Sequence, residues 1–425
     1  MVLLLVIADD FTGALDTGVQ FSKKNVPTLV TTNENIDVKS IGVDVEVLVV
    51  DIESRHSSPE QAYAAVHRIV KNAVREGVPC FYKKTDSALR GNIGAELSAL
   101  LDASDEKTLA FVPAFPKSKR VTIKGIQYIE GVELGKSIFS EDPFEPVKMS
   151  SVAEIIRQQT TLPTVNISTN NYDNTETTPH ERTICVYDAQ SDEDLVRLGA
   201  ALKKSGSLRA LAGCAGFAET LSELMGLRAE KIAWEGNKKN ILIVSGSVNQ
   251  KTIDQMNYAK KAGYHVITLS TEQKLDRGFH TREECDRLVE NVSGLLSRTG
   301  KAIIEAVSER GQILESDRYA RQKGIPSNEL RHLISENIAQ IVRQILDKAD
   351  VGNLVIFGGD TLYSVMKKIK CEGIIPLLEI SPGVVAAKTI SISHGFRVIT
   401  KSGGLGNEDV IKVIDNFIFG VQHHD

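Results

Sequence analysis

Short runs of β-branched and other apolar residues alternate along the chain with longer segments in which apolar positions recur every three or four residues. The short runs predict strands at residues 2–7, 45–51, 80–84, 108–112, 241–244, 265–269, 301–306, 354–357 and 397–400. The longer segments predict helices at residues 58–76, 92–103, 328–348 and 360–370. Strands that alternate with helices are typical of βαβ units and of a mostly parallel sheet, so the pattern predicts an α/β protein.

The same alternation occurs in both halves of the chain, and a polar, glycine-containing stretch at residues 234–240 separates them. The chain has 425 residues, which is longer than the roughly 250–300 residues that a single core usually supports. We therefore predict two domains, residues 1–234 and 240–425, each a mostly parallel sheet flanked by helices. The polar segment 168–182 predicts a surface loop inside the first domain.

Composition and charge exclude several classes of protein. Apolar residues make up 42% and charged residues 25%, as in ordinary soluble globular proteins. The net charge of −5 argues against nucleic-acid binding, which needs a large cationic surface. The apolar run at residues 1–8 is far shorter than the ~20 residues that span a bilayer. Five cysteines without a C-x-x-C pair favour neither disulfides nor a cysteine zinc site. We expect a cytoplasmic protein without membrane or nucleic-acid partners.

Charged residues follow the predicted strands of the first domain at the points where those strands end. They are Asp9, Asp10, Asp16, Lys83, Lys84, Asp86 and Arg90. Ligands of open parallel sheets bind beyond the carboxyl ends of the strands, so these residues predict a site for a polar ligand. The planar guanidinium of Arg90 suits a carboxylate or a phosphate. Lys83 and Lys84 cannot both face the site, because successive side chains of a strand alternate between its faces.

The second half contains three glycine-rich turns, each directly after a predicted strand. Glycine lets backbone N–H groups approach a phosphate closely, and a helix amino terminus behind the turn favours negative charge. Three such turns at one sheet edge favour a cradle for the phosphates of a nucleotide. The residues expected to contact it are Ser245, Gly246, Ser247, Gly358, Gly359, Asp360, Thr361, Gly403, Gly404 and Gly406.

These motifs together resemble the four-carbon acid sugar kinase family. The matching segments are residues 7–14 with Asp16, 83–92, 113–116, 142–143, 245–247, 358–361 and 401–403. They occur in the family's order from residue 7 to about residue 406, which is nearly the whole chain. Two turns depart from the family's usual sequence, at residues 248–249 and at Gly404, so their side-chain contacts are not carried over. The resemblance implies an N-terminal domain that binds a sugar acid and a C-terminal domain that binds ATP.

The resemblance further implies an ATP-dependent kinase that phosphorylates a hydroxyl of a four-carbon sugar acid such as threonate, erythronate or a 3-oxo-tetronate. Its cofactors would be ATP and Mg²⁺, and its active site would lie in the cleft between the domains. The expected substrate-binding residues are Asp10, Arg55, Lys83, Lys84, Asp86 and Arg90.

A carboxylate must orient the attacking hydroxyl in phosphoryl transfer. The candidates are Asp10, Asp16 and Asp86 in the first domain and Asp360 in the second. We prefer Asp360 because it opens a helix beside the expected phosphates, and the helix dipole keeps it ionised.

Two other functions stay open. A phosphatase or lyase that acts on a phosphorylated sugar acid without a nucleotide would account for the charges of the first domain but not for the three glycine turns. A non-catalytic ligand sensor with the same fold would leave the carboxylates without a role. For the enzyme, a homodimer is the default assembly.

Overall fold

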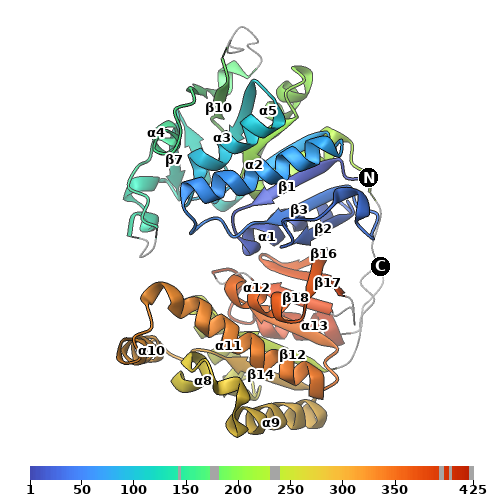
Figure 1. The fold of residues 1–425 in the computed structure, drawn as a ribbon, viewed down its shortest axis with the longest axis vertical. Coiled ribbons are helices and arrows are strands. Elements are labelled where there is room, and N and C mark those ends of the chain that lie inside the picture. Colours follow the sequence, from blue (N-terminus) through green and yellow to red (C-terminus); the bar gives the residue numbers. More distant parts are fainter. Residues whose placement is uncertain (142–144, 173–180, 230–239, 392–396, 402–403, 421–425) are drawn as a thin grey trace. The chain divides into compact units, whose positions relative to one another are not determined.

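The computed structural model describes residues 1–141, 145–172, 181–229, 240–391, 397–401 and 404–420 (Figure 1). The chain divides into two compact units, Met1–Ile232 and Ala233–Asp425. Each unit is built on a mostly parallel sheet flanked by helices, which confirms the predicted α/β class. No helix of the described segments has the length and hydropathy needed to cross a membrane.

The sheet of the first unit is parallel, with its strands in the order β2-β3-β1-β4-β11-β5-β10-β9. The strands are β1 (Leu4–Ala8), β2 (Thr28–Thr31), β3 (Val47–Asp51), β4 (Cys80–Lys84), β5 (Thr108–Val112), β9 (Thr164–Ile167), β10 (Thr183–Tyr187) and β11 (Ala210–Gly213). Every residue of β1 is buried, because helices cover both faces of the sheet. This burial explains why the strand is a continuous apolar run rather than an alternating one.

Helices flank the sheet of the first unit on both sides. They are α1 (Phe11–Ser22), α2 (Pro59–Arg75), α3 (Ile93–Ser104), α4 (Val152–Arg157), α5 (Asp192–Lys204) and α6 (Ala215–Met225). Helix α1 packs against α6, and α2 packs against α3 on the opposite face (Figure 1). The start of α2 follows from its sequence, because Ser58 and Gln61 form a capping box and Pro59 occupies the first turn.

A small antiparallel sheet extends from the first unit between β5 and β9. It consists of β6 (Arg120–Ile123), β7 (Ile126–Ile129) and β8 (Val132–Glu133). The chain then continues through the described residues 145–151 into α4. This insertion brings residues 145–159 next to the carboxyl end of the main sheet, where they line the cavity described below.

The sheet of the second unit has the order β13-β14-β12-β15-β18-β17-β16. Its strands are β12 (Ile241–Ser245), β13 (Val266–Thr268), β14 (Lys301–Glu305), β15 (Asn353–Phe357), β16 (Cys371–Ser381), β17 (Val384–Ser391) and β18 (Arg397–Lys401). Strands β12, β13, β14, β15 and β18 are parallel to one another. Strand β17 is antiparallel to its two neighbours, β16 and β18.

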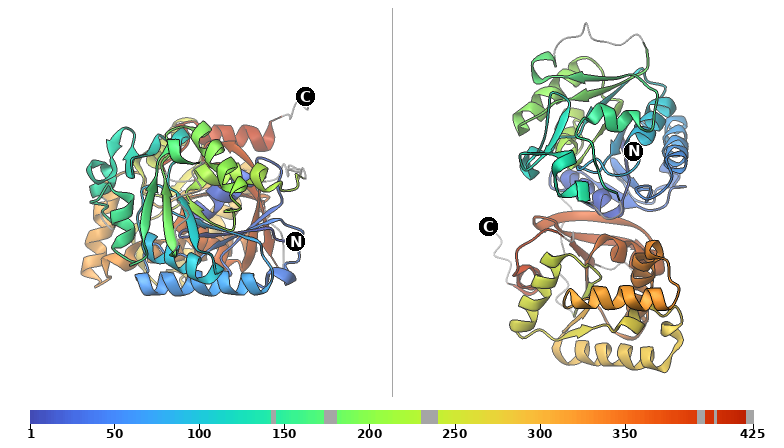
Figure 2. Two further views of the ribbon diagram at one scale, coloured as in Figure 1. Left: turned by 90° about the horizontal axis from the view of Figure 1, so that it is seen from above. Right: turned by 90° about the vertical axis from the view of Figure 1, so that its left-hand side faces the viewer.

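The helices of the second unit are α7 (Gln250–Lys261), α8 (Thr271–Leu275), α9 (Glu283–Thr299), α10 (Gly311–Gln322), α11 (Ser327–Lys348), α12 (Gly359–Lys368) and α13 (Val410–Phe419). Helices α7 and α13 cover one face and share a core with alternate residues of β12, β15 and β18. Helices α9, α11 and α12 pack together on the other face, and Figure 2 shows the long α11 lying across that face.

The predicted elements agree closely with this structure. Strands β4 and β5 have the predicted bounds, and the other predicted strands and helices differ by at most two residues at either end. The sequence did not reveal the antiparallel pair β16 and β17, nor β2, β9, β10 and β11. Within the predicted loop 168–182, Thr169–Asn171 forms a short 3₁₀ turn, and residues 173–180 lie outside the described residues.

Candidate functional site

The charged residues of the first unit gather where β1, β3 and β4 end. These strands are neighbours, and the chain leaves β1 towards α1 on one face but leaves β3 and β4 towards α2 and α3 on the other. A crevice opens at such a switch point in an open parallel sheet, and ligands bind there. The topology therefore brings Asp10, Arg55 and the segment 85–92 to the same edge of the sheet.

Arg55 forms the centre of this group of charges. Its Nε donates to Asp9 Oδ2 at 2.8 Å, and its two terminal nitrogens donate to the two oxygens of Asp10 at 3.0 Å and 2.6 Å. Its backbone N–H also donates to the carbonyl of Asp9 at 3.1 Å. Asp9 is buried, whereas the side chain of Asp10 is 24% exposed. The guanidinium thus fixes the orientation of Asp10, whose side chain is still accessible from outside.

The surrounding cations keep this cluster ionised. Burial alone would raise the pKa of Asp9, but the charges of Arg55, Lys83 and Lys84 outweigh burial and lower it. Burial would also lower the pKa of Arg55, but the carboxylates of Asp9, Asp10 and Asp86 raise it well above its ordinary value. The site is therefore a network of opposite charges rather than an isolated cationic pocket.

Lys83 and Lys84 point to opposite faces of β4. The ammonium of Lys83 is fully buried, lies 3.0 Å from Glu96 Oε2 on α3, and also donates to the carbonyl of Lys84 at 2.9 Å. Lys84 lies on the α1 side, where its Nζ would be 2.7 Å from a Cβ at Gly13. The hydroxyl of Ser54 donates to Glu96, so the Lys83–Glu96 pair supports the loop that carries Arg55. Lys84, by contrast, lies beside the first turn of α1.

Asp86 and Arg90 form a second fixed pair. Arg90 donates to the two oxygens of Asp86 from Nε at 2.7 Å and from a terminal nitrogen at 3.2 Å. Its guanidinium lies 5.2 Å from the centre of the Phe139 ring, and Arg120 lies 5.3 Å from the same ring. Burial would raise the pKa of Asp86, but Arg55 and Arg90 lower it strongly. Arg90 is thus held in place before any ligand binds.

A cavity of about 350 Å³ opens beside both arginines. Its charged lining consists of Arg55, His56, Arg90, Glu145 and Lys148. Glu145 Oε1 lies 2.9 Å from His56 Nδ1, and Glu145 is the one acid among the described residues that line the cavity. The cavity has the size and the charge to take a small anionic molecule.

The amino terminus of α3 also borders this cavity, but a side chain already occupies it. Gln159 Oε1 accepts from the N–H groups of Gly94 at 2.9 Å and Ala95 at 3.4 Å. Asn92, the residue before α3, donates to the carbonyl of Ser54 at 2.8 Å. An anion in the cavity would therefore be bound by the side chains of arginine and lysine, not by the free N–H groups of a helix.

Several residues of this region were not found by sequence reasoning. Asp51 ends β3 and is buried, and burial together with the charge of Glu53 raises its pKa well above the ordinary value. Glu53 has a positive φ of 44° and accepts from the Phe11 N–H at 3.0 Å. Asp51 could have been found, because it is an acid at a strand end like Asp9. Nothing in the local sequence marks Lys148 or Gln159, which lie beyond the small antiparallel sheet.

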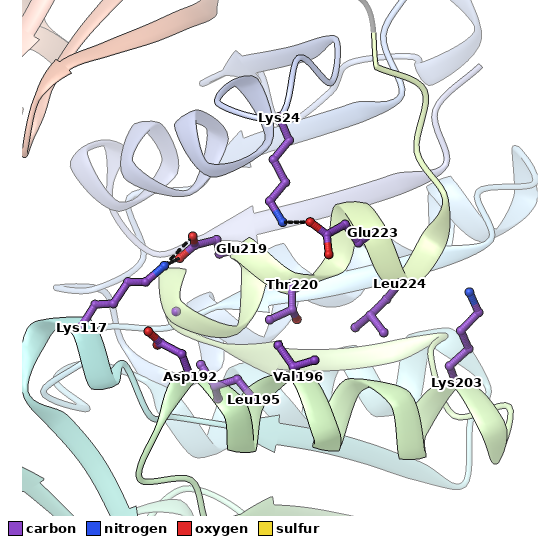
Figure 3. Close-up of a pocket in the computed structure, with 11 residues that line it drawn as sticks. Lys24, Lys117, Asp192, Leu195, Val196, Lys203, Glu219, Thr220, Glu223 and Leu224 are labelled. Carbon is purple, nitrogen blue, oxygen red and sulfur yellow. Dashed lines mark hydrogen bonds and ion pairs between the residues drawn. The ribbon is translucent and has the colours of Figure 1, made fainter.

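A second cavity of about 370 Å³ lies in the first unit beside α5 and α6 (Figure 3). Two exposed ion pairs border it, Lys117–Glu219 at 2.6 Å and Lys24–Glu223 at 2.7 Å. Its other walls include the apolar side chains of Leu195 and Leu224. None of the residues predicted to bind the substrate lines it, so we do not assign it to the site.

The first two glycine turns of the second unit are in contact with each other. A Cβ at Gly246 would lie 1.9 Å from Thr361 Oγ1, and a Cβ at Gly358 would lie 3.4 Å from the backbone nitrogen of Ser247. Gly358 also has a φ of 109°, which other residues rarely adopt. Both glycines are therefore required for the close approach of the two turns.

These turns lie at a switch point of the second sheet. The chain leaves β12 towards α7 on one face and leaves the neighbouring β15 towards α12 on the other. Ser245 and Thr361 are buried, whereas Asp360 is exposed in the first turn of α12. Asp16, the remaining candidate acid, lies in α1 of the first unit and is half-buried.

The third turn follows β18. Gly403 lies outside the described residues, Gly404 is exposed, and Gly406 has a φ of 81°. The side chain of Gln255 in α7 donates to the carbonyls of Leu405, Gly406 and Asn407 at 3.1, 3.2 and 2.9 Å. Helix α7 thus supports the described part of this turn.

Comparisons with known proteins cover both units. Residues 4–221 match the family model of the sugar-binding N-terminal domain, and residues 242–411 match that of the nucleotide-binding C-terminal domain. A D-threonate kinase of Salmonella typhimurium is 28% identical over 96% of this chain and 96% of its own length. A D-erythronate kinase of Heliobacterium modesticaldum is 28% identical over 96% of this chain and 94% of its own length.

Two further relatives extend this picture. A 3-oxo-tetronate kinase of Pseudomonas fluorescens is 25% identical over 96% of this chain and 95% of its own length. The crystal structure of a Haemophilus influenzae protein covers 97% of this chain and 100% of its own, with a TM-score of 0.77 at 21% identity. That structure shares the fold.

Proposed function

Because the chain belongs to the family that joins a sugar-binding N-terminal domain to a nucleotide-binding C-terminal domain, we propose that it is an ATP-dependent kinase of four-carbon sugar acids. The observation that carries the proposal is the cavity of the first unit, lined by Arg55, Arg90 and Lys148. Its size and charge suit a small hydroxy acid. Full-length relatives named as kinases of threonate, erythronate and 3-oxo-tetronate support the same class of substrate.

The arginines of the cavity would bind the acid without first having to be ordered. Arg55 and Arg90 are each held by aspartates of the same unit, so substrate binding costs little side-chain entropy. The carboxylate of the acid would lie towards Arg90 and Lys148. Its hydroxyls would donate to Asp10, whose side chain Arg55 orients.

The glycine turns of the second unit would bind the triphosphate. The N–H groups of the turns after β12 and β15 lie at a switch point, where a phosphate can accept from them. Mg²⁺ would be bound by phosphate oxygens of the nucleotide, since it usually takes only one or two carboxylates from the protein. When bound, the metal neutralises charge on the transferred phosphoryl group.

The base that orients the attacking hydroxyl is proposed to be Asp360, with Asp10, Asp16 and Asp86 as the other candidates. Asp360 is exposed at the start of α12 beside the phosphate turns. Replacement of the true base by asparagine should lower kcat most, and replacement of the other candidates should lower it less. If Asp360→Asn retains the kcat of the wild type, Asp360 is not the base.

ADP release by the purified protein tests the proposed activity. Mg-ATP is supplied with D- and L-threonate, D- and L-erythronate and 3-oxo-tetronates in turn. We expect turnover with at least one acid, its loss in Arg90→Ala, and full activity in Arg75→Ala, which removes an exposed arginine of α2. If none of these acids causes ADP release, the proposed substrate class is wrong. The alternative of a phosphatase or lyase without a nucleotide predicts no change of melting temperature with Mg-ATP.

The expectation that catalysis takes place in a cleft between the domains stays a prediction. Small-angle scattering with the acid and a non-hydrolysable ATP analogue together tests it, since closure around both ligands would reduce the radius of gyration.

A further inference from the structure

Lys84 ends β4 as a buried lysine, and only 6% of it is exposed. Its Nζ points to the first turn of α1, where a Cβ on Gly13 would lie 2.7 Å from Nζ and 2.5 Å from Asp10 Oδ1. No described residue forms a hydrogen bond or an ion pair with this ammonium, and the charges of Asp9 and Asp86 act on it from a greater distance. Its three N–H groups are therefore available to a ligand beside Asp10.

Arg120 is a second cation at this edge of the sheet. It is the first residue of β6 and is half-buried. Its Nη1 donates to Ser87 Oγ, and its guanidinium lies 5.3 Å from the centre of the Phe139 ring. Neither partner is an anion, and none of the carboxylates in the described part of the chain forms an ion pair with Arg120. The hydroxyl and the ring thus hold the guanidinium in place without compensating its charge.

Three other cations of the same region show the contrast. Arg55, Lys83 and Arg90 each form an ion pair with a carboxylate, at 2.8, 3.0 and 2.7 Å respectively. The protein itself therefore supplies the opposite charge for these three side chains. For Lys84 and Arg120, an anionic ligand would supply it.

The two cations without ion pairs border the same place, the start of α6. Lys84 lies opposite the last residue of β11, and Cys214 follows that strand. The thiol of Cys214 donates to the carbonyl of Ala114 at 3.2 Å. Arg120 is held against the same loop, because its backbone N–H donates to the carbonyl of Phe115 at 3.1 Å. Burial raises the pKa of Cys214, and the charges of Lys84 and Arg120 both oppose this rise, as expected if both lie near it.

We propose that Lys84 and Arg120 together bind the phosphoryl group while it is transferred to the sugar acid. The inference rests on the proposed function, in which Arg90 and Lys148 bind the carboxylate of the acid and Asp10 binds its hydroxyls. In the transfer, a bond forms between the hydroxyl oxygen and the γ-phosphorus, and the bond from this phosphorus to the β–γ bridging oxygen breaks. ADP leaves, and the hydroxyl proton passes to the catalytic carboxylate. Lys84 and Arg120 neutralise the negative charge of the phosphoryl oxygens during this step.

Steady-state kinetics with Mg-ATP and the acid that causes ADP release tests the proposal. Arg120→Met and Lys84→Met should each lower kcat about 100-fold and leave the KM of the acid nearly unchanged, because the two cations act on the transferred group. Lys148→Met, which alters the cavity, should act mainly on this KM. Arg120→Lys keeps the charge but loses the planar guanidinium, so its kcat should lie between those of the wild type and Arg120→Met. Arg75→Met removes an exposed arginine of α2 and should behave as the wild type.

Calorimetric binding in the absence of nucleotide separates this role from a structural one. The phosphorylated acid, prepared with the wild type, should bind about tenfold more weakly to Arg120→Met than to the wild type. The unphosphorylated acid should bind equally to both proteins. A purely structural residue would change the two affinities together. The melting temperature of each variant without ligand shows whether the variant is folded.

The outcomes distinguish the inference from the function on which it rests. A wild type that releases no ADP with any acid overturns the proposed function and the inference with it. If the wild type is active and both variants keep its kcat, or change only the KM of the acid, the inference alone is wrong. A loss of kcat that follows a fall in melting temperature, with equal losses of affinity for the two acids, also overturns it. If Arg120→Met does not fold, Arg120→Lys and Lys84→Met are measured in its place.

Discussion

The guanidinium of Arg55 binds the carboxylate of Asp10 through two parallel hydrogen bonds of 3.0 Å and 2.6 Å. Paired bonds of this kind fix the relative orientation of both groups, which a single ammonium cannot do. Asp10 is therefore held in one direction while its side chain is still 24% exposed to a ligand. Arg55 contributes to the site by positioning this aspartate as well as by its charge.

Replacement of Arg55 by lysine should show this positioning role. Arg55→Lys keeps the charge but loses the paired geometry, so we expect kcat/KM to fall about 100-fold. Asp10→Asn should cause a similar loss, and the double variant should lose little more than either alone, because both changes remove the same interaction. Steady-state kinetics of the three variants measures this. Losses that multiply would show that the two residues act independently.

The two lysines of β4 should differ in the property that their replacement changes. Lys83→Met leaves the fully buried carboxylate of Glu96 without its cation, so we expect a loss of about 3–5 kcal/mol in the free energy of unfolding. Lys84→Met should lower kcat/KM instead, with a smaller change in stability. Urea denaturation and steady-state kinetics on both variants test the contrast. A Lys83→Met protein of unchanged stability would contradict the structural role of the Lys83–Glu96 pair.

Asp86 should contribute to stability in a pH-dependent way. Although burial opposes it, the nearby charges of Arg55 and Arg90 lower its pKa below the value of about 3.9 in an unfolded chain. A carboxyl whose pKa is lowered by folding stabilises the protein above the unfolded pKa, and this contribution is lost as the pH falls through the folded pKa.

We therefore expect Asp86→Asn to be less stable than the wild type by about 2 kcal/mol at pH 7, since Arg90 loses its buried partner but is itself partly exposed. The difference should be constant down to about pH 4 and should shrink below it. Urea denaturation of both proteins between pH 7 and pH 3 measures it. If the stability difference between the two proteins grew towards acidic pH, the pKa of Asp86 would not be lowered by folding.

The contact of the first two glycine turns predicts a specific defect in nucleotide binding. A Cβ at Gly246 would lie 1.9 Å from Thr361 Oγ1, so Gly246→Ala must push the turns apart. We expect the increase in melting temperature caused by Mg-ATP to be lost. Adding Thr361→Ala to this variant removes the clashing oxygen, so it should restore part of the increase in melting temperature. Only part is expected, because the Cβ of residue 361 still lies 3.1 Å from a Cβ at position 246.

Gly311→Ala serves as the matched control for this variant. Gly311 begins α10, its φ is not positive, and a Cβ there would lie no nearer than 3.7 Å to another group. Its response to Mg-ATP should equal that of the wild type. An unchanged response in Gly246→Ala would show that the turns tolerate separation and that their contact does not form the cradle.

The sequence alone determined the elements and the places where chemistry can occur. The spacing of apolar residues and the local composition depend only on neighbouring residues. The buried strand β4 and the amphipathic helix α2 could therefore be recognised from the sequence. A strand end is also visible in the sequence, which is why Asp10 and Arg90 could be assigned to one sheet edge. The order of motifs along the chain was sufficient for the family resemblance.

The tertiary structure decided which of these side chains meet and in what role. Arg55 and Asp10 are 45 residues apart, and Gln159 and Gly94 are 65 residues apart, so no local pattern relates them. Alternation along β4 excluded a common direction for Lys83 and Lys84, but only the packing of α3 against the strand showed that Lys83 is the one that pairs with Glu96. Partners and directions depend on contacts between distant segments, and those contacts exist only once the chain has folded.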